Sequence, residues 1–154
     1  MSRDTRFHSQ VRRLLKAVSH GPVTSSVAFQ LSRSGLLPSA VWRRLPVRGE
    51  FDVRLDGGHS FRYSSDDGLG RALFWKGMSA WCEATELRDF CRLAAHARRF
   101  VDVGANTGVY SLLACAVNSE CRVMAFEPVP RLHEHLTANL QLNGWTDLCE
   151  MHRE

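Results

Sequence analysis

The chain has 154 residues, a formal net charge of +4 and 44% hydrophobic residues. This composition indicates one globular domain and excludes disordered, collagen-like and repeat proteins. No stretch approaches the roughly 18 consecutive apolar residues that a membrane span requires. The N-terminal segment is too charged for the apolar core of a signal peptide. The sequence therefore predicts a cytoplasmic protein without a transmembrane segment.

Residues 1–48 form a basic N-terminal extension. They hold nine Lys or Arg and one acidic residue, Asp4, which gives this segment a net charge of +8. The hydrophobic pattern predicts short helices over residues 9–20 and 25–45. A basic arm can bind nucleic acid or an anionic membrane surface. Because no aromatic residues interleave with the charges, a solvated helical face is the favoured interpretation, and no nucleic-acid partner is expected.

Residues 49–80 are predicted to form a hairpin and a short helix that lead into the core. Apolar and polar residues alternate over 51–55 and again over 61–63, and Gly57-Gly58 marks the turn between them. A short helix is predicted from Gly68 to Lys76, with Gly77 as its end.

Residues 81–154 alternate between helical and strand patterns. A helix is predicted over 86–97 with Thr85 as its N-cap, followed by an apolar strand over 100–103. A helix then starts at Val109, and a second strand covers 122–126. Leu132, Leu136 and Leu140 predict a further helix that is stopped by Asn143-Gly144, and a third strand begins within 147–151. This order predicts an α/β fold with a parallel sheet and right-handed crossovers.

The five cysteines are odd in number and form no Cys-x-x-Cys pair. This pattern favours buried thiols in a reducing compartment over a disulfide framework or a zinc site. No metal site is predicted.

A glycine-rich loop, Gly104-Ala105-Asn106-Thr107-Gly108, follows the first predicted parallel strand. In an open parallel sheet, ligands bind beyond the carboxyl ends of the strands. Gly104 would allow a sharp exit from the strand and a close approach of a ligand to the main chain, and Gly108 would let the next helix start close to the sheet. The free N–H groups of Asn106 and Thr107 are expected to point into the crevice.

Two acidic residues flank this loop in the expected fold. Glu127 lies 19 residues after Gly108, at the end of the next strand, where a carboxylate can accept both hydroxyls of a ribose. Asp102 would orient the loop or approach a cationic amine on the ligand. The alternative is that Asp102 only accepts loop amides and that Glu127 is a solvated strand end.

The loop also discriminates between cofactors. Nicotinamide and flavin folds need Gly-x-Gly-x-x-Gly, whose middle glycine lets a pyrophosphate lie on the backbone, and Asn106 occupies that middle position here. The pattern Asp-x-Gly-x-x-x-Gly suits a nucleoside without a pyrophosphate and points to S-adenosylmethionine. An NAD(P)-dependent oxidoreductase and a non-catalytic nucleotide-binding module remain as alternatives.

The stretches "FVDVGANTGVYSLLA" and "VMAFEPVPRLHEHLTANLQLNG" resemble the FkbM family of class I S-adenosylmethionine-dependent methyltransferases. The resemblance implies a Rossmann-like fold and O-methylation of a small-molecule acceptor such as a sugar or natural product. It also implies that Gly104–Gly108 passes under the methionine part of the cofactor, that Asp102 places its amino end, and that Glu127 holds the ribose hydroxyls. Glu83 would lie near the same cofactor.

The resemblance also implies what the 154 residues leave out. The class I fold usually has seven strands, and this sequence reaches about the third. No general base is assigned, because His133, His135 and His152 are expected at the surface. Without a fourth strand, the strand over 100–103 would have an unpaired edge. We therefore expect this chain to be a fragment, marginally stable and inactive by itself.

Overall fold

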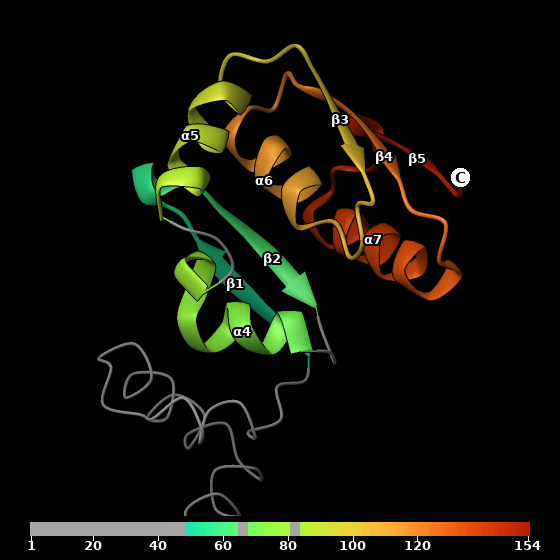
Figure 1. Ribbon diagram of the computed structural model, residues 1–154, viewed down its shortest axis with the longest axis horizontal. Coiled ribbons are helices and arrows are strands. Elements are labelled where there is room, and N and C mark those ends of the chain that lie inside the picture. The colour runs from blue at the N-terminus through green and yellow to red at the C-terminus, as the bar shows by residue number, and fades with distance from the viewer. Residues whose placement is uncertain (1–48, 65–67, 81–83) are drawn as a thin grey trace, which may run out of the picture.

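A computed structural model of the chain describes residues 49–64, 68–80 and 84–154 (Figure 1). The predicted helices over 9–20 and 25–45, the basic extension 1–48 and Glu83 lie outside these described residues. Among the described residues, no helix combines the length and the apolar composition that crossing a membrane requires.

The first described elements form the predicted hairpin and short helix. Strands β1 (Glu50–Arg54) and β2 (Ser60–Ser64) pair antiparallel around a 3-10 turn over Asp56–Gly58. The alternating pattern turns one face of the hairpin inward, because Val53, Phe61 and Tyr63 are all buried. Helix α4 (Gly68–Lys76) has the predicted bounds, and a 3-10 turn over Gly77–Ala80 follows it.

The second half of the chain forms a parallel sheet with helical connections. Strands β3 (Arg99–Val103), β4 (Arg122–Phe126) and β5 (Cys149–His152) lie in the order β3-β4-β5, and both pairs are parallel. Helix α6 (Val109–Val117) connects β3 to β4, and α7 (Pro130–Asn143) connects β4 to β5. Parallel strands joined by helices are a Rossmann-like α/β arrangement, which confirms the predicted fold class.

The boundaries of α5 and β5 differ clearly from the prediction. Helix α5 spans Ala84–Ala94, so Thr85 lies inside its first turn and is not its cap. The helix ends earlier than predicted because the Asn118 side chain donates hydrogen bonds to the carbonyl oxygens of Ala94 and Ala97, at 3.2 and 2.9 Å. Strand β5 starts only at Cys149, since a 3-10 turn over Thr146–Leu148 takes up the residues before it.

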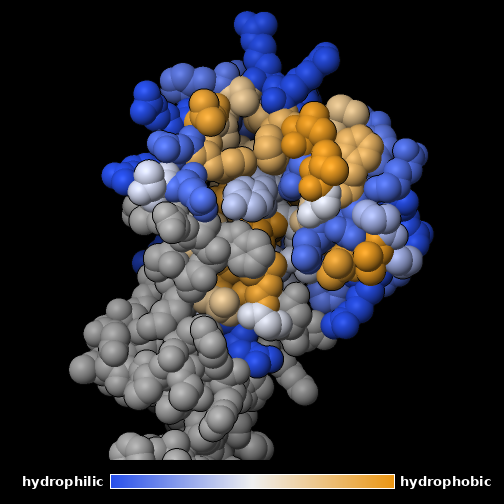
Figure 2. Space-filling view, in the orientation of Figure 1, coloured by the Kyte–Doolittle hydropathy of each residue, from blue (hydrophilic) through white to orange (hydrophobic). Residues whose placement is uncertain are grey.

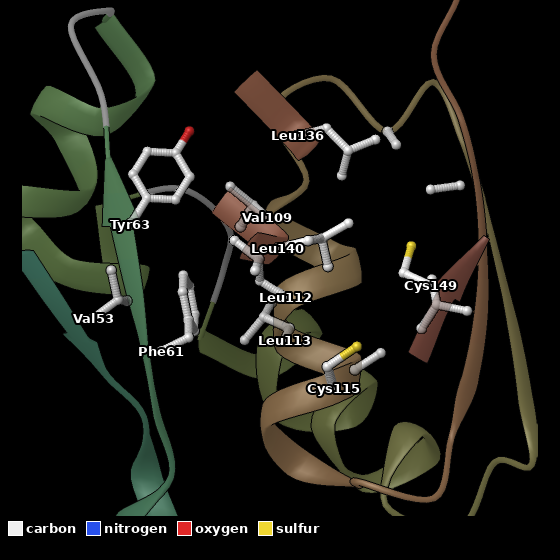
Figure 3. Close-up of a cluster of buried hydrophobic side chains, with 14 of the residues drawn as sticks. Val53, Phe61, Tyr63, Val109, Leu112, Leu113, Cys115, Leu136, Leu140 and Cys149 are labelled. Carbon is white, nitrogen blue, oxygen red and sulfur yellow. The ribbon is translucent and has the colours of Figure 1, made fainter. Parts of the chain in front are cut away.

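Helices α6 and α7 lie between the hairpin and the parallel sheet (Figure 3). Helix α6 is the centre of the core, and Leu112 and Leu113 on it are fully buried. The hairpin side chains Val53 and Phe61 point toward this helix from one side, and Cys149 of β5 lies on the other side. The hairpin is thus a third layer of the core.

The opposite face of the parallel sheet carries exposed apolar residues. Val101 and Val103 on β3 are 54% and 80% exposed. Figure 2 shows apolar surface on the side of the molecule where the three parallel strands lie. Within the described part of the chain, β3 pairs with β4 alone, so its other edge is unpaired, as the sequence predicts.

Candidate functional site

The glycine-rich loop is tied to the end of the neighbouring strand. The N–H groups of Gly104 and Ala105 both donate to the carbonyl oxygen of Phe126, the last residue of β4, at 2.9 Å each. The chain can turn sharply here because Gly104 has a φ of 75°, in the left-handed region that glycine adopts without steric cost. The structure therefore brings the loop after β3 and the end of β4 together, as the parallel order predicts.

Glu127 joins the two strand ends through its side chain. One carboxylate oxygen, Oε2, accepts the N–H of Asn106 at 2.8 Å, and Oε1 accepts the N–H of Val129 at 2.9 Å. The residue is only 4% exposed, so it is not the solvated strand end of the alternative interpretation. The expected free N–H of Asn106 is also corrected, because this group is bound to Glu127.

Asp102 lies under the loop, on the face of β3 that is turned toward α6. It is 8% exposed, and the hydroxyl of Ser111 donates to its Oδ2 at 2.6 Å. Burial raises the pKa of the Asp102 carboxyl, hydrogen bonds from Ser111 oppose that shift, and the nearby charge of Glu127 adds to it. The hydroxyl of Ser111 on α6 is thus a partner of Asp102. The alternative interpretation had expected the amides of the loop in this role.

The two loop glycines serve different purposes. A Cβ at Gly104 would meet no atom within 4 Å, so space is open beside the main chain at this point. A Cβ at Gly108, whose φ is 90°, would lie 2.5 Å from Cδ1 of Leu136. Gly108 thus permits the close packing of the loop against α7, whereas the sequence predicted a close approach to the sheet.

Three polar residues outside the predicted set support the loop. The hydroxyl of Tyr63 lies 2.5 Å from that of Thr107, and the amide of Asn139 donates to the Thr107 carbonyl at 3.0 Å. Ser111 bonds to Asp102, as described above. Ser111 carries a weak sequence signal, because a hydroxyl at a buried position of an otherwise apolar helix needs a partner. No periodic pattern links Tyr63 or Asn139 to the loop.

Among the described cysteines and histidines, Cys149 and His152 of β5 border this site, and the carbonyl oxygen of His152 accepts the N–H of Glu127 at 2.9 Å. Burial raises the pKa values of the Cys115 and Cys149 thiols to about 12, so both stay protonated at neutral pH. Cys115, Cys121 and Cys149 are buried as predicted, whereas Cys91 is half-buried and Cys82 lies outside the described residues. His133 and His135 lie on α7, half-buried, and the ring of His152 stacks on Phe126 with centroids 4.6 Å apart. Among the described residues, no group of three or more potential ligands could hold a metal ion.

The sequence matches no protein-family model and no curated protein. Solved structures align with part of the chain. An S-adenosylmethionine-dependent methyltransferase from Agrobacterium tumefaciens is 14% identical, and the alignment covers 77% of this chain and 42% of that chain, with a TM-score of 0.48. An RNA methyltransferase from Salinibacter ruber, in complex with S-adenosyl-L-homocysteine, is 20% identical, with coverages of 47% and 48% and a TM-score of 0.42.

A cofactor-bound protein from MTB is 27% identical to the chain over 46% of its residues and 34% of that protein, with a TM-score of 0.40. The chain thus spans less than half the length of these three proteins.

Proposed function

We propose that the chain carries the S-adenosylmethionine-binding part of a methyltransferase of the FkbM family, which methylates an oxygen atom of a sugar or another small molecule. The position of Glu127 is the observation that supports this proposal most. Its carboxylate is buried at the end of β4 and holds the glycine loop through the N–H of Asn106 at 2.8 Å. One acid therefore fixes the loop and stands at the crevice where ligands of parallel sheets bind.

The residues at the crevice fit an adenosyl group. Each Glu127 oxygen accepts one backbone N–H, and a carboxylate oxygen has two lone pairs, so each keeps one for a ribose hydroxyl. Beside Gly104, the open space within 4 Å leaves room for a ligand against the main chain. The resemblance to the family assigns the same two positions to the ribose and to the methionine part.

The charges favour a cationic ligand over a pyrophosphate. Asp102 and Glu127 are both buried, and the charge of Glu127 raises the pKa of Asp102. An ammonium or sulfonium group would relieve this repulsion between like charges, whereas a pyrophosphate would add to it. Asn106 also places a side chain where a dinucleotide needs glycine. Both observations favour S-adenosylmethionine over a nicotinamide cofactor.

The chain's own residues would contribute positioning. When bound, the cofactor would supply a methyl group, carried on a positively charged sulfur, for direct transfer to an acceptor oxygen. Glu127 would hold the ribose, Asp102 the amino end, and residues 104–108 the methionine part. Because the departing thioether needs no proton, alignment of the reacting atoms is the main task of these residues.

Calorimetric titration with S-adenosylhomocysteine and with NADH tests the proposal. We expect heat with S-adenosylhomocysteine alone. Glu127→Gln should weaken this binding about 10-fold or more, because a hydrogen bond to a charged acceptor is lost. The exposed Glu120→Gln, on the turn after α6, should bind like the wild type. No heat with S-adenosylhomocysteine, equal binding of NADH, or an unaffected Glu127→Gln variant would contradict the proposal.

A further inference from the structure

A buried hydroxyl pair connects the hairpin to the glycine loop. Tyr63 of β2 is fully buried, and its hydroxyl lies 2.5 Å from Oγ1 of Thr107, which is itself buried. The two residues are 44 positions apart in the sequence. Because a buried hydroxyl without a partner is costly, each of the two fixes the position of the other.

Asn139 of α7 makes a second connection to the same loop residue. Its Nδ2 donates to the carbonyl oxygen of Thr107 at 3.0 Å, and its Oδ1 accepts the N–H of Ser64 at 2.9 Å. Asn139 is fully buried, so both ends of its amide are satisfied away from water. Thr107 is therefore held at its side chain by Tyr63 of the hairpin and at its main chain by Asn139 of α7.

These contacts hold a loop with a left-handed backbone on both sides of Thr107. Asn106 and Gly108 have φ values of 54° and 90°. Glycine and asparagine are the residue types that adopt this region most readily, so the sequence permits the bend and the contacts of Thr107 fix its position. The residue before Thr107 is held as well, because the N–H of Asn106 donates to Glu127.

We infer that Tyr63, Thr107 and Asn139 are positioning residues for cofactor binding, through which the hairpin sets the affinity of the glycine loop for S-adenosylmethionine. This inference rests on the proposed function. The physical reason is preorganisation: a loop that is already ordered by the hairpin loses less conformational entropy when the ligand binds.

The test compares the affinities of four variants for S-adenosylhomocysteine with that of the wild-type chain. Tyr63→Phe and Thr107→Val each remove one hydroxyl, Thr107→Ser keeps it, and Val53→Ala trims a buried residue of β1 that lies in the same hairpin. Loss of one neutral hydrogen bond predicts binding about 3- to 10-fold weaker for Tyr63→Phe and Thr107→Val. Thr107→Ser should stay near the wild type, and Val53→Ala should lower the melting temperature without changing the affinity.

The outcomes separate this inference from the proposed function. If the wild type binds and Tyr63→Phe binds equally well, or if Val53→Ala weakens binding as much as Tyr63→Phe does, the inference is wrong and the proposed function stands. If the wild type does not bind, the proposed function is wrong and this inference falls with it. Should Tyr63→Phe not fold, the comparison of Thr107→Val with Thr107→Ser decides in the same way.

Discussion

Asp102 is an acidic residue whose buried environment disfavours the ionised form of its carboxyl group. Burial and the charge of Glu127 raise the pKa of this carboxyl from its ordinary value of 3.8, and hydrogen bonds from Ser111 only partly oppose them. In the unfolded chain the carboxyl therefore ionises at a lower pH than in the folded chain. Its contribution to the free energy of unfolding falls as the pH rises from 3.8 through the raised pKa.

Asp102→Asn should remove this pH dependence. We expect the stability of the variant, relative to the wild type, to increase as the pH rises above 3.8. Urea denaturation at a series of pH values measures the difference. Asp89→Asn, on the exposed side of α5, is the matched control and should follow the wild type. A difference between Asp102→Asn and the wild type that does not change with pH would contradict this account.

The two loop glycines should respond differently to substitution by alanine. Both have positive φ values, so each variant is strained by about 1 kcal/mol. Gly108→Ala should lose about 1 to 2 kcal/mol more, because its Cβ would lie 2.5 Å from the buried Leu136. Gly104→Ala should instead weaken cofactor binding, since its methyl group occupies the open space. Thermal denaturation measures the loss of stability, and calorimetry measures the loss of cofactor binding. Equal losses of stability in the two variants would contradict this prediction.

At the level of the elements, periodicity predicted most of the structure. Helices α4 and α6 and strand β4 have the expected bounds, because their apolar patterns stop at glycine, asparagine or an acid-proline pair. The predicted end of α5 was wrong, because the observed end depends on the side chain of Asn118, more than twenty residues away. Tertiary contacts of this kind leave no local pattern in the sequence.

The docking of the hairpin on α7 was not predictable for the same reason. The Asn143 amide donates to the carbonyl oxygen of Arg62 and accepts its N–H, both at 2.8 Å. A side chain thereby pairs with the outer edge of β2, where another strand would otherwise be needed. The alternation over 61–63 predicts a strand but does not indicate what covers its edge.

Asn143→Ala should loosen this contact. Both hydrogen bonds to Arg62 would be lost at an exposed site, so we expect about 1 kcal/mol of destabilisation. Chemical denaturation measures the loss, and amide hydrogen exchange should show faster exchange in β2. Gln141→Ala, exposed on the same helix, serves as the control. Equal stability of the two variants would show that the pairing contributes nothing.

At the scale of the whole molecule, helices cover one face of the parallel sheet. Val101 and Val103 are exposed on the other face, next to an edge of β3 that pairs with no other strand of the described residues. Exposed apolar edge strands promote association with another chain. This surface follows from a sequence in which Asp102 faces the helices, because its two apolar neighbours must then face outward.

Val103→Lys should reduce self-association of the chain. A charge on an edge strand opposes pairing with a second strand. We expect sedimentation velocity to show a smaller concentration dependence for this variant than for the wild type. Leu93→Lys provides the control, because Leu93 is 74% exposed but lies on α5, away from any strand edge. If both substitutions act equally, general hydrophobicity explains the association and the edge does not.

The candidate site was predictable in part. Local spacing placed the glycine loop and Glu127 at the ends of adjacent strands, because parallel strands share one carboxyl edge. The bond between Glu127 and Asn106, and the support of Thr107 by Tyr63, depend on how distant elements pack. The glycine loop and Glu127 could thus be identified from the sequence, whereas Tyr63 and Asn139, which hold the loop in place, could not.

A crystal structure of the chain grown with S-adenosylhomocysteine would test whether Glu127 holds the ribose. We expect both ribose hydroxyls within hydrogen-bonding distance of the Glu127 carboxylate, and the methionine part against residues 104–108. A ribose bound elsewhere, with Glu127 contacting only the main chain of Asn106 and Val129, would contradict it.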